Sequence, residues 1–463
     1  MVNKLHKMRT RVVKVEKARE NDPQVTAKAG LSLAQALASR LRLWSDARRE
    51  LPSRKDTKQG YETTAVIGSL VHGLLSGGRG FSATEPMRGD KPLLKMLGLD
   101  RAPSAETVEE VVKYLALETE GKEALTRLNH HFVNRLIDAS SRSDLYSCEG
   151  FVPFWADGSL LEVYGKNFDS IKIKEYMRGQ MSVGAFVGPW LTEVDFAGEG
   201  EGEETLGRQM LKEAMENILR PKKLVKETLV LLDSLYGDGP TFDMLEAIRE
   251  NPSFIVGVQK LKQAEQVMNE LPDVVWRDSG ADSSRGWEAS GVAQVWLSVK
   301  GWKTKRTMIC RRWKNEGEMF WNYAGVVTNL TAEDPRVKKS MEKCERSFEE
   351  VIWRLYSHKQ GMENRWKDLL IDMGLHHPPC AKAKVNAVFY AIAGLAYNLS
   401  VGVRQLTLTG GLSKMRLWRL RREVFDLAGC VVNHGRKVIM RILDARDHLI
   451  EQFLSAMYRL ARL

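Results

Sequence analysis

Closely spaced cysteines are absent from the sequence. Five cysteines are scattered without a CxxC pair: Cys148, Cys310, Cys344, Cys380 and Cys430. Neither a disulfide framework nor a four-cysteine zinc site is therefore indicated, and a reducing compartment fits. The segment His376–Cys380 (HHPPC) has no second ligand pair at a suitable spacing, so we expect no zinc there.

Two further features are missing. The first twenty residues lack an apolar core and a small-residue cleavage site, so we expect no secretory signal and a protein that stays inside the cell. No Walker lysine follows the glycine-rich segment 198–202, whose glutamates would repel phosphate. We therefore expect no nucleotide cofactor.

Long uncharged runs are scarce, with one exception. Residues 385–403 (VNAVFYAIAGLAYNLSVGV) contain no charged side chain and approach the length of about 20 residues that spans a bilayer. Asn386 and Asn398 within the run would be costly in lipid. We interpret the segment as the central helix of a soluble domain and expect no membrane partner.

The positive charge is concentrated at the two ends. Residues 1–60 hold 15 Lys/Arg against 6 Asp/Glu, and residues 401–463 hold 12 against 5. Because the whole chain has a formal charge of +11, the part between them is net −5. Basic ends around an acidic centre favour ends that bind phosphate and a centre that supplies carboxylates. The alternative is that both ends are merely soluble helices.

The first 145 residues are predicted to be mostly helical. Residues 29–48 and 62–75 carry apolar residues at helical spacing, and Ser104 begins an N-cap signature ahead of a helix over 108–117. Small basic helical bundles commonly present a helix to a DNA groove. We predict an N-terminal DNA-binding region over residues 1–145.

From Phe151 onward the pattern predicts an α/β domain. Short apolar runs (FVPFWAD, LLEVYG, MSVGAFVG and LTEVDFAG) precede a helix over 205–219. A buried strand, TLVLL, then ends at Asp233, and a helix over 242–249 and a strand over 254–258 follow. Strand, helix and strand in alternation predict a mixed or parallel sheet covered by helices.

Alternating apolar residues between about 270 and 330 predict an all-β insertion into this domain. We place the first part of the core at 146–265, the insertion at 266–332 and the second part of the core at 333–408. Residues 409–463 form a basic C-terminal region, with a hairpin around Asn433–Gly435 and a closing helix over 448–463.

Two aspartates follow runs that we expect inside the sheet. Asp157 follows FVPFWA, and Asp233 follows TLVLL. A buried strand-end carboxylate generally requires a cation, a hydrogen-bond network or a metal, and Mg²⁺ favours carboxylate oxygens. Either aspartate alone is also compatible with a structural role, whereas the pair favours a site.

A predicted helix over residues 353–370 carries the third candidate, Glu363. Tyr356, Lys359, Glu363 and Lys367 follow one another at three, four and four residues, so they project from one face within roughly 80°. The alternative interpretation is a surface helix with a Glu363–Lys367 ion pair.

These segments resemble the DDE-type transposases of bacterial insertion sequences, whose catalytic domain is RNase-H-like. The resemblance rests on WADGSLLEVYGK around Asp157, LVLLDSLYGDG around Asp233 and YSHKQGMENRWKD around Glu363. One branch of the family has a Tyr-x2-Arg-x3-Glu-x6-Lys pattern, in which Tyr356 and Glu363 match. Lys359 replaces the Arg, and Leu370 stands at the Lys position, with Lys367 one turn earlier.

The resemblance implies an α/β fold with an RNase-H-like mixed sheet and metal-dependent phosphoryl transfer on DNA. Two Mg²⁺ or Mn²⁺ ions would be held by Asp157, Asp233 and Glu363. Tyr356, Lys359 and Lys367 would contact the DNA. No covalent protein–DNA intermediate is needed.

Aromatic and basic residues of the insertion are further candidates for stacking on or clamping distorted DNA ends. They are Trp296, Trp302, Arg306, Arg311 and Trp313. A core or hairpin-surface role is the alternative for each of them.

The resemblance also implies the partners: the terminal inverted repeats of a transposon, target DNA and a second copy of the chain on paired ends. The expected location is the bacterial cytoplasm, at the nucleoid. Two alternatives stay open, a DNA-binding protein derived from a transposase that no longer cuts and a metal-dependent nuclease without strand transfer.

Overall fold

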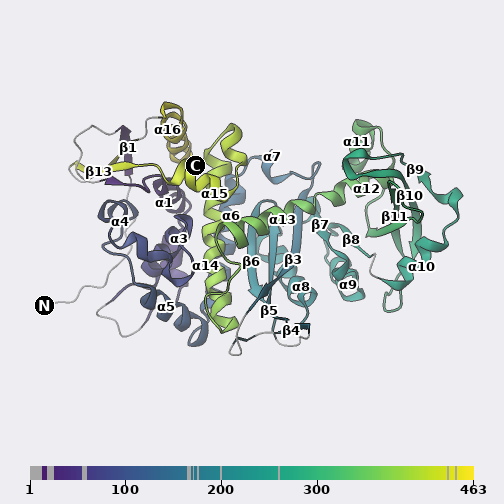
Figure 1. The fold of residues 1–463 in the computed structure, drawn as a ribbon, viewed down its shortest axis with the longest axis horizontal. Helices are drawn as coiled ribbons and strands as arrows, with labels where there is room; N and C mark the ends of the chain where they lie inside the picture. Colours follow the sequence, from purple (N-terminus) through teal and green to yellow (C-terminus); the bar gives the residue numbers. More distant parts are fainter. Residues whose placement is uncertain are drawn as a thin grey trace.

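The structure is a computed structural model that describes residues 13–17, 25–54, 60–163, 168–169, 171–174, 177–198, 201–258, 261–434, 437–443 and 446–463. Over these ranges the chain has a mixed α/β architecture. Figure 1 shows the N-terminal helices at one end, the large sheet in the middle and strands β9 to β12 at the opposite end.

The large sheet has ten strands in the order β4-β5-β3-β7-β8-β12-β11-β10-β9, with β6 paired to β5. Its strands are β3 (Val152–Glu162), β4 (Ile171–Lys174), β5 (Met177–Val187), β6 (Trp190–Phe196), β7 (Thr228–Leu232), β8 (Ser253–Gly257), β9 (Arg277–Asp278), β10 (Trp287–Leu297), β11 (Arg306–Asn315) and β12 (Asn322–Thr328). The β3–β7 and β7–β8 pairs are parallel, and the others are antiparallel. The sheet is therefore mixed, as predicted.

The central strands follow the predicted pattern. Every residue of β7 and β8 is buried, which is why both read as continuous apolar runs in the sequence. In contrast, the runs FVPFWAD and LLEVYG do not form two separate strands. Residues 152–162, from both runs, lie in the single strand β3, which pairs with β5 from Phe154 to Glu162, and Tyr164 and Gly165 lie outside the described residues.

The predicted insertion does not form a sheet of its own. Strand β12 pairs with β8 through Val327 and Val256, so β9 to β12 extend the central sheet. The segment is also not all β, because helix α10 (Lys262–Glu270) and the short turns η5 (Asp273–Val275) and η6 (Ser283–Arg285) precede β10. The domain boundaries proposed from the sequence stay predictions.

The N-terminal part is mostly helical, as predicted. It contains α1 (Leu31–Arg40), α2 (Leu43–Glu50), α3 (Thr63–Leu75), η1 (Gly80–Met87), α4 (Lys91–Leu97), α5 (Ala105–Leu117), α6 (Gly121–Ala139) and α7 (Arg142–Leu145). The predicted cap at Ser104 is present, since its hydroxyl accepts a hydrogen bond from the Thr107 backbone N–H at 3.3 Å.

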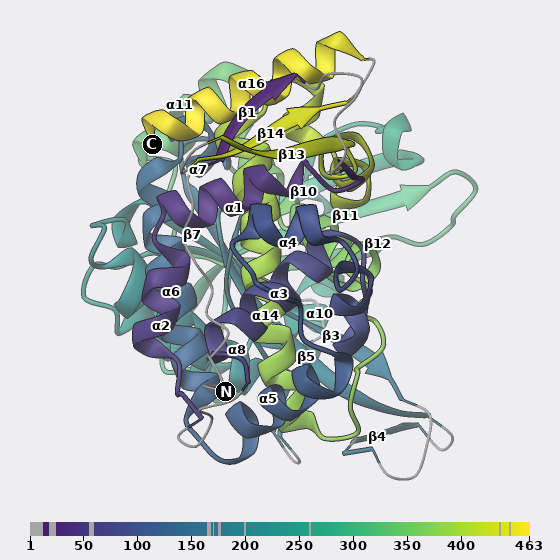
Figure 2. The same ribbon diagram turned by 90° about the vertical axis from the view of Figure 1, so that its left-hand side faces the viewer.

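The uncharged segment forms helix α14 (Ala383–Gly402) at the centre of the molecule. It packs against α3, α5 and α6 on one side and β6 on the other, as Figures 1 and 2 show. Among the described helices it is the one long and apolar enough to cross a membrane, but 94% of its apolar window is buried in the protein. Helix α14 therefore joins the N-terminal helices to the sheet.

The remaining helices surround this core. They are α8 (Glu203–Ala214), η2 (Met215–Leu219), η3 (Val225–Glu227), η4 (Ser234–Tyr236), α9 (Gly239–Glu246), α11 (Pro335–Cys344), α12 (Phe348–Ser357), α13 (Gln360–Lys367), η7 (Asp368–Asp372), η8 (Val403–Thr407), η9 (Gly410–Lys414), α15 (Leu417–Leu420), η10 (Arg421–Phe425) and α16 (Asp447–Arg462). The predicted helix over 353–370 is thus divided between α12 and α13 at His358 and Lys359.

A second sheet of four strands joins the two ends of the chain. Its order is β1-β14-β13-β2, with β1 (Val13–Lys17), β2 (Val25–Thr26), β13 (Gly429–His434) and β14 (Lys437–Ile442). The antiparallel β13–β14 pair confirms the predicted hairpin, whose Gly435 lies outside the described residues. Figure 2 shows this sheet beside α16 and above the N-terminal helices.

Candidate active site

The two predicted aspartates lie level with each other on adjacent strands. Strands β3 and β7 run parallel with Trp155 opposite Leu231, and Asp157 and Asp233 each follow by two residues. Beyond this point β7 has ended while β3 continues along β5, so Asp157 lies within a strand, not at its end. The end of β7 leaves the edge of β3 open beside Asp157.

Asp233 caps the turn that follows its strand. One of its carboxylate oxygens accepts a hydrogen bond from the Leu235 backbone N–H at 2.8 Å, which starts η4. A carboxylate has further lone pairs, so this contact leaves acceptor capacity for a cation. The turn fixes where Asp233 points.

Residues at the break between α12 and α13 meet the same strand ends. The Lys359 ammonium lies 3.5 Å from an Asp157 carboxylate oxygen, and about one-fifth of each side chain is exposed. The Tyr356 hydroxyl donates a hydrogen bond to the Leu232 carbonyl at 3.2 Å, one residue before Asp233. Two of the four residues predicted to share a helical face therefore reach the aspartates.

A glycine makes room for the tyrosine. A β-carbon at Gly257, the last residue of β8, would lie 2.7 Å from the Tyr356 hydroxyl and 2.9 Å from the Ser234 backbone nitrogen. Real side chains do not approach so closely, so any larger residue would push the tyrosine or the η4 turn away. Gly257 thus permits the close packing of α12 on the β7 and β8 ends.

Helix α13 is fixed over β3 and β5 by Trp366. Its ring packs on Gly184, the residue paired with Asp157 on β5, where an added β-carbon would lie 3.1 Å away. It also meets Phe186 edge to face at 6.2 Å between ring centroids. The helix is therefore held close to Asp157.

The other two residues of the predicted face, Glu363 and Lys367, are exposed on α13. The prediction that all four project together assumed one continuous helix, and the break at His358 and Lys359 changes that geometry. The role of Glu363 as third acid and the DNA contact of Lys367 both stay predictions.

Sequence reasoning missed a carboxylate that the structure places here, Glu203. It is the first residue of α8, and a carboxylate oxygen accepts a hydrogen bond from the Gly158 backbone N–H at 2.8 Å. The only signal in the sequence was the acidic segment GEGEGEE, which reads as a solvated loop. Its position next to Asp157 depends on how α8 packs on β3.

The carboxylates influence one another electrostatically. Burial raises the pKa of Asp157, against the lowering effect of Lys359, and Asp233 raises it further. Burial raises the pKa of Glu203 to about 7, with added contributions from Asp157 and Asp233. Burial and the same two aspartates raise the pKa of Tyr356, so its phenol stays protonated and donates to the backbone.

This donor set suits a hard divalent cation, since carboxylate oxygens in a partly buried setting are the ligands that Mg²⁺ and Mn²⁺ take. Within the described ranges no three His, Cys, Asp or Glu side chains already surround one point. The carboxylates that would hold an ion here are those of Asp157 and Asp233, on the adjacent strand ends.

The predicted insertion residues take part in packing contacts. Arg306 is 5% exposed, pairs with both carboxylate oxygens of Glu246 at 2.7 and 2.8 Å, and stacks on Phe242 and Trp302. A DNA contact from Arg306 stays a prediction and would require that ion pair to open. Trp302 is partly buried against Phe242.

Arg311 lies between two indole rings. Its guanidinium is 4.5 Å from the Trp353 ring centroid and 5.4 Å from that of Trp287, which stacks on Trp313. Trp353 in turn meets Tyr356 edge to face, so these contacts link the insertion to the end of α12. Trp296, by contrast, is 68% exposed and available at the surface.

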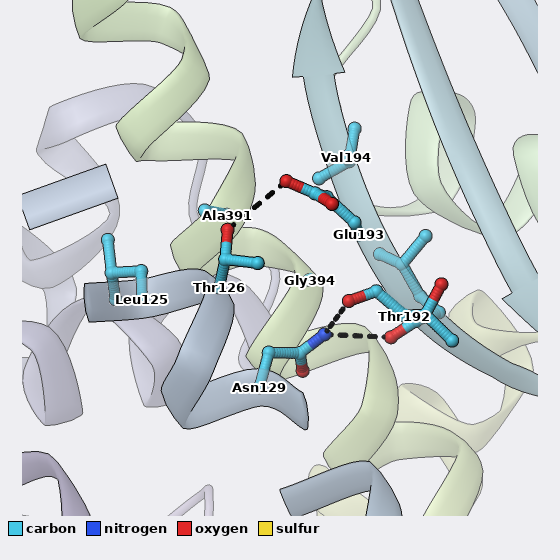
Figure 3. A pocket seen from close by; sticks show the side chains of 9 residues that line it. Leu125, Thr126, Asn129, Thr192, Glu193, Val194, Ala391 and Gly394 are labelled. Atoms are coloured by element: carbon cyan, nitrogen blue, oxygen red, sulfur yellow. Dashed lines mark hydrogen bonds between the residues drawn. The ribbon is translucent and has the colours of Figure 1, made fainter. Parts of the chain in front are cut away.

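A small cavity between α6, α14 and β6 is shown in Figure 3 and is a packing feature. Its volume is about 10 Å³. The Asn129 amide donates to the Leu191 and Thr192 carbonyls at 2.8 Å, and the Thr126 hydroxyl donates to Glu193 at 3.2 Å. These bonds tie α6 to β6.

Comparison with known proteins gives the family. The model of the family described as "Transposase DDE domain group 1" matches residues 199–463, more than half of the chain. Glu203, Asp233 and Glu363 lie inside this range, and Asp157 precedes it. No curated protein matches the chain.

A cryo-EM structure of a piggyBac transposase synaptic complex with hairpin DNA is similar to this chain at 10% sequence identity and a TM-score of 0.38, covering 93% of this chain and 80% of that one. Assignment to a family rests on the domain match, because a similarity this weak carries no weight by itself. The chain belongs to the DDE transposases of domain group 1, enzymes that in general cleave DNA with divalent metal ions.

Proposed function

We propose that this chain is the transposase of a bacterial insertion sequence, which cleaves DNA at the transposon ends and joins them to a target. The observation that carries the proposal is the level placement of Asp157 and Asp233 on two adjacent parallel strands, next to Lys359. An RNase-H-like core is part of the proposal, supported by the mixed sheet with a parallel centre.

Asp157 and Asp233 would hold the divalent ions, Mg²⁺ or Mn²⁺, with Glu363 as the third acid. When bound, two such ions supply activation of a water or 3′-hydroxyl and stabilisation of the leaving oxygen. Lys359 balances the charge of Asp157 in their absence and would be displaced toward the DNA phosphate. Tyr356 holds the end of β7, and thereby Asp233, in place through Leu232.

Glu363 lies on the exposed face of α13, four residues after Lys359, whose ammonium contacts Asp157. We infer that DNA and metal together bring Glu363 into the site.

DNA is the proposed partner, as the terminal repeats and as target, and two copies of the chain would act on paired ends. The small sheet supports a single DNA-binding surface, because it pairs β1 of the basic N-terminal segment with β14 of the basic C-terminal segment. Action on bacterial DNA places the proposed location at the nucleoid in the cytoplasm.

The test is excision of a marked element with its native ends in cells that supply the wild-type chain or the Asp157→Asn, Asp233→Asn or Glu363→Gln variant. These changes remove charge with little change of shape, and we expect excision to fall at least about a thousandfold in each, of the size seen when a catalytic group is removed. Asp243→Asn on α9 and Glu342→Gln on α11 are matched controls. Excision by all three variants at the wild-type level would refute the assignment.

Two measurements separate the remaining alternatives. Gel shifts with the same variants report DNA binding, and a wild-type chain that binds ends without excising them would be a DNA-binding protein derived from a transposase. A supplied target plasmid reports strand transfer. Cleaved ends without joined products would identify a metal-dependent nuclease.

A further inference from the structure

Glu203 lies beside Asp157 in the proposed site, but the sequence-based predictions give it no role. It stands at the start of α8, and this helix packs on β3 and β5. Its carboxylate meets the strand one residue after Asp157, at the Gly158 backbone N–H. Glu203 is half-buried, so it does not belong to the solvated part of the acidic loop.

The residue at position 158 is what lets this carboxylate approach. A β-carbon on Gly158 would lie 2.4 Å from the Glu203 carboxylate carbon and from one of its oxygens. Any side chain there would displace the carboxylate from the strand. The Glu203 carboxylate thus occupies the space that a methyl group on residue 158 would fill.

The charges around this point do not balance. The carboxylates of Asp157, Asp233 and Glu203 belong to neighbouring residues at these strand ends, and the Lys359 ammonium lies 3.5 Å from an Asp157 oxygen. Three carboxylates in a partly buried setting with one ammonium leave an excess of negative charge. A divalent cation would compensate that excess.

We propose that Glu203 is a further ligand of the divalent ion that Asp157 and Asp233 would hold, a ligand that the Asp157, Asp233 and Glu363 set does not include. The proposal rests on the proposed function. Its rival is a purely structural role, in which Glu203 only fastens α8 to β3 through Gly158. The two roles differ in one respect: loss of a ligand weakens metal binding, whereas loss of a fastening lowers stability whether or not metal is present.

The experiment is calorimetric titration of the full-length protein with MnCl₂, together with thermal unfolding with and without Mn²⁺. The variants are Glu203→Gln, Gly158→Ala, Asp157→Asn and, as matched control, Glu204→Gln. Glu204 lies in the same first turn of α8. Glu204→Gln therefore removes the same charge near the helix N-terminus as Glu203→Gln, and the two variants share any effect on the helix dipole. Gly158→Ala keeps every carboxylate and only displaces Glu203.

We expect Glu203→Gln and Gly158→Ala to weaken Mn²⁺ binding at least about tenfold, and Glu204→Gln to leave it within twofold. Wild-type binding that Asp157→Asn abolishes but Glu203→Gln leaves unchanged would overturn this proposal and leave the proposed function standing. Equal losses of thermal stability with and without Mn²⁺ in Glu203→Gln would identify the fastening role. Absence of Mn²⁺ binding by the wild type would overturn the metal assignment itself.

Discussion

The contact between Gly257 and Tyr356 allows a prediction whose size follows from the structure. A β-carbon at Gly257 would lie 2.7 Å from the tyrosine hydroxyl, 2.9 Å from the Ser234 nitrogen and 3.2 Å from the Asp233 carbonyl carbon. Gly257→Ala therefore forces a shift, and such overpacking costs about 1–3 kcal/mol of unfolding free energy. Because the shift reaches the residue next to Asp233, excision should fall as well.

Removing the hydroxyl should relieve part of that strain. Tyr356→Phe alone loses the hydrogen bond to the Leu232 carbonyl, which is 3.2 Å long, and should cost about 1 kcal/mol. In the double variant the closest clash is absent, so we expect it to be less destabilised than the sum of the single variants by about 1 kcal/mol. Part of the excision activity lost in Gly257→Ala should return.

Urea unfolding followed by tryptophan fluorescence measures the four free energies of this cycle. Gly361→Ala in α13 is the control, since the added carbon meets no atom closer than the Arg365 guanidinium at 3.6 Å and should stabilise the helix by up to about 1 kcal/mol. Additivity of the two single changes within about 0.5 kcal/mol would refute the reasoning, because it would show that Gly257 and the hydroxyl do not compete for one space.

Three other predictions concern the packing around the site. Burial lowers the pKa of His72 and of His130 to about 4. Both imidazoles are neutral in the fold, so their contribution to the unfolding free energy is intact above the ordinary pKa of about 6.5 and is lost as the pH falls toward 4. Each histidine should lower the unfolding free energy by about 2 kcal/mol between pH 7 and pH 5. An unchanged pH dependence of urea unfolding in His72→Phe would contradict this. Arg306→Met should change the unfolding free energy by less than about 1 kcal/mol, because Glu246 is exposed and water can solvate its carboxylate once the ion pair is lost. A loss of DNA affinity in gel shifts at unchanged stability would establish Arg306 as a DNA contact. Asn398→Leu removes three hydrogen bonds to the backbone of β6 and to α6 and should cost about 3 kcal/mol in the same assay, against less than about 1 kcal/mol expected for an exposed asparagine such as Asn364.

Local patterns in the sequence were sufficient for the elements that are buried on all sides or capped by a short motif. TLVLL is a buried strand because all five side chains of β7 face other layers, and the Ser104 cap needs only residues within one turn. The hairpin of β13 and β14 and the buried helix α14 are of the same kind. In each case the information lies within about twenty consecutive residues.

What depended on distant residues was missed. The periodicity of residues 353–370 is helical throughout, and nothing in it indicates that one helix ends at Ser357 and the next begins after Lys359. Likewise, a strand pattern over 287–328 does not show which strand it will pair with, and only the β12–β8 register joins it to the central sheet. Tertiary contacts decided both.

The candidate site shows the same division. Asp157 and Asp233 were predicted from apolar runs beside them, and the parallel register of β3 and β7 places them level. Glu203 was not predicted, because an acidic segment with three glycines gives no sign that its sixth residue will meet Gly158, which lies 45 residues earlier in the chain.

The small sheet has a consequence for how the protein is made. Strand β1 pairs with β14 in parallel, Val13 beside Val438, so the partner of β1 emerges from the ribosome only after more than 400 further residues have been made (438 minus 13). Bringing the two strands together closes a long loop, and the entropic cost of doing so grows only slowly with loop length. The pairing nevertheless forms late, because it joins residues far apart in the sequence. A chain whose synthesis stops before residue 437 would lack a strand of this sheet and could not assemble the surface that joins its two basic ends.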